Sequence, residues 1–275
     1  MTNSCIANGW AMEKYTASTA EPLVISDLDD GVLVLTLNRP KQFNALSVGS
    51  LYALHAALEP VADNQSARVV IIAANGGAFC AGHDLKEMHA ANDHAFVTTL
   101  FRLCSDVMLK IAALPVPVIA EVNGMATAAG CQLVAQCDLA VAADHARFAV
   151  SGVNLGLFCS TPAVPLSRTI SRKRAVEMLM TGEFIDAATA LDWGLVNRVV
   201  PAATLRVETM RLARSLKAKP RATLAAGKAL FYRQMELGLV EAYQDASRTI
   251  ACNFLQPEAR EGVAAFLEKR KPDWT

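Results

Sequence analysis

The sequence predicts an α/β fold in which strands and helices alternate over residues 23–200 and helices dominate residues 201–275. Short apolar, β-branched runs recur along the first part, most clearly at 31–37, 68–74 and 115–120, and such runs are typical of buried strands. Between these runs, apolar residues recur every three or four positions, as on one face of a helix. This interleaving predicts an α/β core followed by a helical region.

Three strands and two helices are expected in the first half of the core. The strand at 31–37 is followed by Ser47 and a stripe at helical spacing: Leu51, Leu54, Leu58 and Val61. The strand at 68–74 ends at Gly76-Gly77, which interrupts it. A second helical stripe precedes the strand at 115–120: Phe96, Leu100, Leu103, Val107 and Ile111.

The second half of the core is expected to begin with a buried helix in the small-residue segment 127–135, followed by a strand at 138–142. A helix over 171–180 ends at Gly182, and Asp186 is placed to cap the next short helix. A short strand at 195–200 precedes the helices that begin near Pro201.

Composition excludes several classes of protein. The 275 residues suit one large domain, and a hydrophobic content of 53% predicts a sizeable core or an oligomer interface. Lys plus Arg equals Asp plus Glu, at 26 each, so no electrostatic footprint for nucleic acid is expected. No apolar run reaches the ~18 residues that a membrane span needs.

The cysteines and the N-terminal residues bear on the cellular compartment. The seven cysteines are odd in number, irregularly spaced and without a C-x-x-C pair, which favours a reduced intracellular chain over a disulfide scaffold or zinc site. His83, His89 and His94 cluster, but no second ligand motif follows, so no metal site is expected. Residues 1–22 lack arginine, a basic start and an apolar block, which predicts a disordered tail and a cytoplasmic location.

Two segments, 77–85 and 124–133, share a pattern that suits a ligand site. Each leaves an expected strand, passes through small residues and enters an expected helix. Small residues let a ligand approach the backbone, and a helix N-terminus presents free N–H groups. Two such loops side by side would form an oxyanion hole, in which one donor is typically worth ~10²–10³ in rate. Tight packing of helix on sheet explains either loop alone equally well, and neither contains a G-x-G-x-x-G dinucleotide motif.

Several short motifs, spread over most of the chain, occur in the order that is typical of one known family. They are Leu37-Asn38-Arg39-Pro40, Asn44-Ala45-Leu46, the run Ala78 to Met88, the run Asn123 to Asp138, Met180-Thr181-Gly182, the run Trp193 to Val200, and the run Phe266 to Pro272. With these motifs the chain resembles the enoyl-CoA hydratase/isomerase (crotonase) family from about Leu23 to Trp274. The resemblance implies a spiral of ββα units and a C-terminal helical region, 201–275, that forms trimers or dimers of trimers. It also implies an acyl-coenzyme A thioester as substrate, without a separate cofactor.

The resemblance also assigns the residues of the catalytic site. The oxyanion-hole amides would be those of His83 and Ala129, while Gln132 and Gly152 stand where the hydratases carry two glutamates. Ser160 stands where other branches place an aspartate. Hydration needs groups that take and deliver a proton; glutamine cannot exchange one near neutral pH, and glycine has no side chain. Together with the segment 159–162, the two missing glutamates resemble the branch of enoyl-CoA hydratase domain-containing proteins.

Further residues are implied for coenzyme A and the acyl chain. Lys41, Ala81 and Lys271 match positions near coenzyme A, with Lys271 arriving from the terminal helix of a neighbouring subunit; a solvated surface residue is the alternative for either lysine. The stripe Phe96, Leu100 and Leu103 either lines an acyl pocket or packs in the core. For the ring of His83, the sequence favours a surface position, and for Glu87 a solvated helix face.

Three hypotheses for function follow. The first is an enzyme, a lyase or isomerase of fatty acid metabolism by its resemblance, that stabilises a thioester enolate, with efficient hydration disfavoured. The second is an acyl-CoA-binding pseudoenzyme or assembly subunit. The third is a serine hydrolase on the related Clp-protease fold, which the absence of a G-x-S-x-G elbow disfavours.

Overall fold

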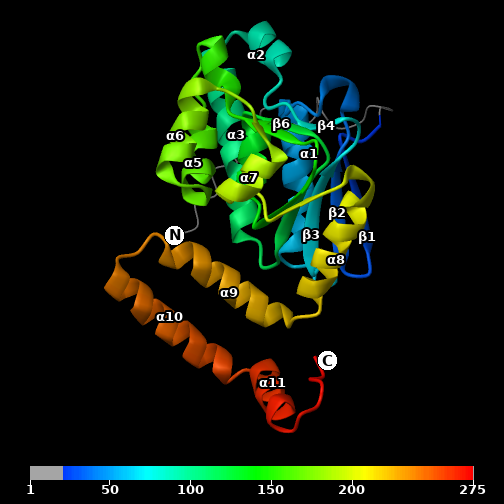
Figure 1. Ribbon diagram of the computed structural model, residues 1–275, viewed down its shortest axis with the longest axis vertical. Coiled ribbons are helices and arrows are strands. Elements are labelled where there is room, and N and C mark those ends of the chain that lie inside the picture. The colour runs from blue at the N-terminus through cyan, green and yellow to red at the C-terminus, as the bar shows by residue number, and fades with distance from the viewer. Residues whose placement is uncertain (1–20, 275) are drawn as a thin grey trace.

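The computed structural model describes residues 21–274, and two sheets form its core (Figure 1). The larger sheet has six strands, in the order β1 (Val24–Asp29), β2 (Val32–Leu37), β3 (Val69–Ala74), β5 (Val118–Val122), β7 (Leu139–Ala143) and β10 (Arg198–Val200). β1 pairs antiparallel with β2, and every other pair in this sheet is parallel. The runs at 31–37, 68–74 and 115–120 all contribute strands to it, as the sequence predicts.

The smaller sheet has four short strands, in the order β4 (Ala78–Cys80), β6 (Met125–Thr127), β8 (Arg147–Ala149) and β9 (Ile185–Asp186). The chain passes from a strand of the larger sheet to one of the smaller sheet and then into helix. β3 and β4 thus lead into α2 (Leu85–Ala91) and α3 (His94–Ala113), and β5 and β6 lead into α4 (Ala129–Gln136). β7 and β8 lead through a 3₁₀ turn, η4 (Ser151–Leu155), into α5 (Ser160–Thr169) and α6 (Arg172–Thr181). This repetition is the expected ββα spiral.

The inner strands of the larger sheet are buried on both faces because helices cover each side. Val70 and Ile72 of β3 face the main core, which includes α1 (Val48–Leu58) and α3. Val69 and Ile71 face the other way, against Leu212 of α8 (Leu205–Lys217). Burial on both sides explains why these strands are continuous apolar runs rather than alternating ones.

The chain ends in three helices that lie apart from the sheets: α9 (Arg221–Gln234), α10 (Leu239–Phe254) and α11 (Pro257–Leu267). Figure 1 shows them, in orange and red, extending away from the core on the side opposite α2. They confirm the expected helical C-terminal region.

Two of the predicted helix ends are confirmed in detail. Gly182 ends α6 in the left-handed conformation, with φ of 65°, where glycine is favoured. Asp186 caps α7 (Ala187–Trp193) by accepting a hydrogen bond from the amide of Thr189 at 2.8 Å. The four strands of the smaller sheet were not predicted as such. Of the expected tail, residues 1–22, all but the last two residues lie outside the described residues. Over residues 21–274, no helix combines the length and apolarity needed to cross a membrane.

Candidate functional site

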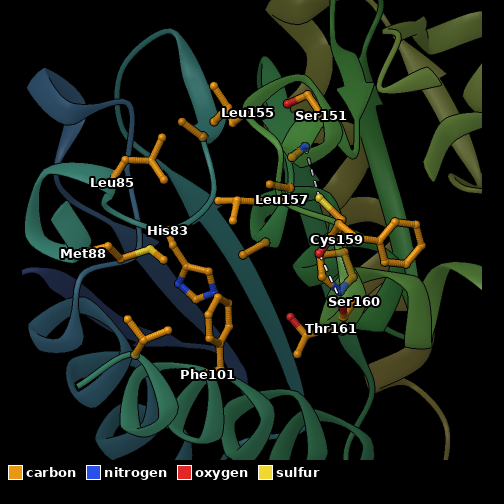
Figure 2. Close-up of a pocket in the computed structure, with 17 residues that line it drawn as sticks. His83, Leu85, Met88, Phe101, Ser151, Leu155, Leu157, Cys159, Ser160 and Thr161 are labelled. Carbon is orange, nitrogen blue, oxygen red and sulfur yellow. Dashed lines mark hydrogen bonds between the residues drawn. The ribbon is translucent and has the colours of Figure 1, made fainter. Parts of the chain in front are cut away.

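A cavity of about 520 Å³ opens where the two small-residue segments meet, between α2 and α3 on one side and α5 on the other (Figure 2). Its lining is mostly apolar, with a few polar side chains. The lining residues are Ala81, His83, Leu85, Met88, Val97, Phe101, Ala128, Ala129, Ser151, Gly152, Leu155, Leu157, Phe158, Cys159, Ser160, Thr161 and Pro162. Among these described residues there is no Asp, Glu, Lys or Arg.

Two glycines bring the segments into contact. A Cβ atom on Gly82 would lie 2.9 Å from the Cβ of Ala128 and 3.3 Å from the amide nitrogen of Ala129, and Gly82 has φ of +90°. A Cβ atom on Gly130 would lie 2.1 Å from the carbonyl oxygen of Cys80. No other residue type fits at either position. The close approach places the loop after β4 against the start of α4.

His83 and Ala129 both line the cavity, and the amide of neither donates a hydrogen bond to another described backbone carbonyl. Ala129 is the first residue of α4, where the helix offers no acceptor for its N–H. His83 lies in a single β-bridge with Leu46, and its neighbours Gly82 and Asp84 make both hydrogen bonds of that bridge. Both segments enter helices, as predicted, but His83 precedes the first helical residue by two positions. α2 begins only at Leu85, so the helix dipole acts at Ala129 alone.

Asp84 holds the loop that carries His83. One carboxylate oxygen caps α2 by accepting from the amides of Lys86 and Glu87, at 3.1 and 3.3 Å. The other lies 2.9 Å from Nη2 of Arg39. Burial on its own would raise the pKa of Asp84, but the Arg39 guanidinium and these amides lower it overall. Glu87 turns back toward α1, where its carboxylate accepts from the amide of Val48 at 2.9 Å; it is half-buried and does not line the cavity.

The ring of His83 lies in the cavity wall rather than on the outer surface. It meets Phe101 edge to face, with ring centroids 4.9 Å apart and planes at 84°. Both ring nitrogens are buried without a hydrogen-bond partner among the described residues. Desolvation, the larger effect, lowers the pKa of His83 to about 4, and the backbone carbonyl of Leu46 opposes this shift. The imidazole is therefore neutral near neutral pH.

The structure separates the two positions that the resemblance assigns to glutamates. Gln132 is 3% exposed and does not line the cavity; its Oε1 lies 4.0 Å from Sγ of Cys104 on α3. Gly152 does line the cavity, but its surroundings leave no space for a side chain. A Cβ atom there would lie 2.6 Å from the carbonyl oxygen of Leu157 and 2.8 Å from Sγ of Cys159. The thiol of Cys159 accepts from the amide of Gly152 at 3.3 Å and fills this place.

Neither nucleophile near Gly152 is activated. Ser160 begins α5 and lines the cavity, and its hydroxyl donates to the carbonyl of Phe158 at 3.3 Å. Burial raises the pKa of the Cys159 thiol, although the amide of Gly152 partly opposes this. A raised pKa keeps the thiol protonated and weakly nucleophilic.

The cavity gathers His83, Ala129, Gly152, Ser160 and Ala81, but not the predicted lysines. Lys41 is exposed in the 3₁₀ turn η2 (Pro40–Gln42), and Lys271 is exposed after α11. Figure 1 places α11 at the far end of the molecule from α2, so Lys271 does not reach this cavity within one chain.

Of the two roles left open for the stripe Phe96, Leu100 and Leu103 on α3, packing in the core is confirmed. Leu100 and Leu103 are buried in the core, and the cavity is lined instead by Val97 and Phe101. These two residues lie four positions apart, on the adjoining face of the same helix. Sequence reasoning also missed Thr161, for which only its place in the segment 159–162 gave a signal.

Comparison with known proteins identifies the family. The enoyl-CoA hydratase/isomerase family matches residues 27–275. The human mitochondrial enoyl-CoA hydratase domain-containing protein 3 is 48% identical over 246 residues, covering 90% of this chain and 81% of that protein. The mouse protein of the same name is 46% identical over 259 residues, covering 94% and 86%.

Solved structures agree with these matches. An enoyl-CoA hydratase from Mycobacterium smegmatis superposes with a TM-score of 0.91 at 58% identity, covering 92% of this chain and 99% of that one. The crystal structure of the human domain-containing protein 3 superposes with a TM-score of 0.89 at 47% identity, covering 92% and 100%.

The relatives contradict one prediction and establish the family. The mouse and human proteins are mitochondrial by name, which overturns the cytoplasmic location predicted from residues 1–22. That prediction rested on the absence of arginine and of an apolar block, and composition alone was too weak a criterion. The match over residues 27–275, the identities above 40% and the shared ββα spiral lead to one conclusion: this chain belongs to the enoyl-CoA hydratase/isomerase family.

Proposed function

We propose that the cavity binds an acyl-CoA thioester, whose carbonyl oxygen accepts hydrogen bonds from the amides of His83 and Ala129. The observation that carries this proposal is the pair of cavity-lining amides with no acceptor among the described backbone carbonyls. Buried N–H groups are almost always paired, so two free ones on one cavity wall favour a ligand oxygen as their acceptor. The apolar remainder of the cavity suits an acyl chain.

Such a site stabilises negative charge on the thioester oxygen. When a base takes a proton from the α-carbon, the electron pair of the C–H bond moves to that oxygen as an enolate forms. The neutral imidazole of His83 is the lining side chain that can accept this proton. Two fixed N–H donors, one of them at the N-terminus of α4, stabilise this charge without reorganisation. The reaction class we propose is therefore enolate chemistry on an acyl-CoA, within the enoyl-CoA hydratase/isomerase family.

Hydration by a carboxylate pair is not the reaction that this cavity favours. Its described lining holds no carboxylate, Gln132 lies behind the lining, and Gly152 is closed by Cys159. Moving protons to and from water and carbon requires a group that exchanges them near neutral pH. The same observation favours a second candidate function, an acyl-CoA-binding protein or assembly subunit without turnover.

Calorimetry with butyryl-CoA and a hydration assay with crotonyl-CoA test both candidates. The proposal predicts saturable binding of butyryl-CoA and hydration well below the ~1–10³ per second of a typical enzyme. Absence of binding would overturn the acyl-CoA site. Binding together with turnover of other acyl-CoA thioesters would exclude the candidate without turnover.

We further propose that the C-terminal helices mediate self-association into a trimer or a dimer of trimers. α10 and α11 carry large apolar side chains that are exposed to solvent in a single chain. Among them are Leu239 at 75%, Tyr243 at 69% and Phe266 at 82% exposure. Apolar exposure of this extent favours an interface between copies of the chain. In such an assembly Lys271 of a neighbouring copy joins Lys41 at the phosphates of coenzyme A. Analytical ultracentrifugation tests the assembly, and a monomer at micromolar concentration would contradict it.

A further inference from the structure

The cavity wall contains polar side-chain atoms that no described residue satisfies. They are both ring nitrogens of His83 and the Oγ1 atom of Thr161, all three buried. Leaving a buried donor or acceptor unpaired costs the desolvation of that group without compensation, so unpaired groups call for an explanation. Two such side chains in one cavity point to a polar ligand group.

Thr161 differs from the other hydroxyl residues of α5. Ser160 donates to the carbonyl of Phe158, and Thr169 donates to the carbonyl of Pro165 at 2.8 Å. Thr161 lies in the first turn, and its hydroxyl finds no carbonyl among the described residues. Figure 2 shows this hydroxyl directed into the cavity, toward the wall that carries His83 and Phe101.

The cavity lining restricts the charge of a ligand group that pairs with these side chains. No charged side chain is present among its described residues, and transferring an unpaired ion into such a site is costly. A neutral imidazole offers one donor and one acceptor, and a hydroxyl offers both as well. This set complements an alcohol or ketone oxygen and not a carboxylate.

We propose that His83 and Thr161 form a specificity site for acyl-CoA thioesters whose acyl chain carries an uncharged oxygen, as a hydroxyl or keto group. The site extends the proposed function, on which it rests, by naming the class of acyl chain. The two side chains stand on opposite walls, on the loop after β4 and on α5, so an acyl chain between them meets both (Figure 2). All three polar atoms are covered by their surroundings, so rotation of the His83 ring about its Cβ–Cγ bond and of the Thr161 side chain about its Cα–Cβ bond accompanies binding.

Calorimetry with matched ligands tests the specificity site. Octanoyl-CoA, 3-hydroxyoctanoyl-CoA and 3-oxooctanoyl-CoA differ only in the oxygen. Two hydrogen bonds of about 0.5–1.5 kcal/mol each predict that the wild type prefers an oxygenated ligand by about 5- to 150-fold. Thr161→Val, which keeps the shape of threonine, and His83→Phe, which keeps an aromatic ring, both lower this ratio toward one. Thr161→Ser keeps a hydroxyl and retains the preference.

Each outcome bears on the site separately from the acyl-CoA proposal. Equal affinity of the wild type for all three ligands would overturn the specificity site while leaving the acyl-CoA site in place. A preference that survives both Thr161→Val and His83→Phe would also overturn it, because the oxygen would then bind elsewhere. If none of the three ligands binds, the acyl-CoA proposal itself fails, and this site fails with it.

Discussion

The ammonium of Lys228 lies 2.7 Å from Oδ2 of Asp138, and this ion pair joins α9 to the turn between α4 and β7. The side chains are only 8% and 15% exposed. Lys228 also donates to the carbonyls of Ile111 and Val116, at 2.8 and 3.0 Å, and Tyr232 donates to the other carboxylate oxygen at 2.8 Å. Desolvation lowers the pKa of Lys228, and the Asp138 charge opposes that shift. The network fixes the first of the three C-terminal helices to the core.

Lys228→Met is therefore expected to destabilise the fold strongly. The variant keeps the apolar stem but leaves Asp138 without its cation, and breaking a buried pair costs about 3–5 kcal/mol. Arg233→Met is the matched control on the same helix, because Arg233 is 51% exposed and pairs with Asp245 of α10. An exposed pair contributes about 0–1 kcal/mol. If urea unfolding showed that Lys228→Met and Arg233→Met lower the free energy of unfolding equally, the anchoring role of Lys228 would be contradicted.

Arg39 is expected to act as a positioning residue for the oxyanion hole. Its guanidinium binds both Asp84 and the carbonyl of Ala45, the latter at 2.7 Å, and so holds the loop that carries His83. Arg39→Met should weaken butyryl-CoA binding by about 10-fold, the effect of roughly 1.4 kcal/mol. Arg174→Met is the control, since Arg174 pairs with Asp192 on the surface. Unchanged affinity in Arg39→Met, measured by calorimetry, would show that the loop keeps its position without the pair.

Gly152 is expected to reject any side chain. Because a Cβ atom would contact the carbonyl of Leu157 and the thiol of Cys159, Gly152→Ala should destabilise the fold by about 1–3 kcal/mol. Gly77→Ala is the matched control, as a Cβ atom on Gly77 would meet nothing within 4 Å. The same contacts predict that Gln132→Glu combined with Gly152→Glu does not restore hydration, because the second carboxylate displaces its own loop. A double variant that hydrates crotonyl-CoA would refute this account of Gly152.

The low pKa of His83 predicts how stability depends on pH. Unfolding returns the ring toward its ordinary pKa of 6.5, so between about pH 4 and 6.5 the unfolded chain binds the additional proton. Stability therefore falls as the pH falls through this window, and it is unaffected by His83 above it. His83→Phe should make the decline shallower. Desolvation also lowers the pKa of His55, so part of the decline remains.

Urea unfolding at several pH values checks this dependence. His145→Gln serves as the control because His145 lies on the surface, with its side chain 58% exposed. Identical slopes for His83→Phe and the wild type would contradict the buried, neutral state of the ring.

The inner strands of the larger sheet could be predicted from sequence because they are buried on both faces. Residues 69–74 read as an unbroken apolar run for that reason, and residues 118–122 as a run interrupted only by Glu121. The edge strand β1 is mostly exposed and was not predicted. The smaller sheet could not be predicted so well, since β4, β6 and β8 are three residues long and made of small or mixed residues. Such strands are too short for an alternating pattern to emerge.

The candidate site, like the two sheets, could be predicted from sequence only in part. Glycine and alanine composition located both loops, since close backbone approach restricts residue size at Gly82 and Gly130. Which face of α3 meets the cavity depends on how the helix is rotated, and its broad apolar stripe is compatible with Leu100 or Phe101 facing inward. The closure of Gly152 by Cys159 joins positions that only the folded loop brings together.

The carbonyl stretching frequency of a bound thioester tests the central claim most directly. Butyryl-CoA with a ¹³C-labelled carbonyl, observed by infrared difference spectroscopy, reports the hydrogen bonds to that oxygen alone. Donation from the amides of His83 and Ala129 predicts a shift to lower frequency on binding. Ala129→Pro removes one N–H at the first position of α4, where proline is tolerated, and should reduce the shift. Ala129→Gly keeps the N–H and the shift. A bound thioester whose frequency equals that of free butyryl-CoA in water would contradict the oxyanion hole.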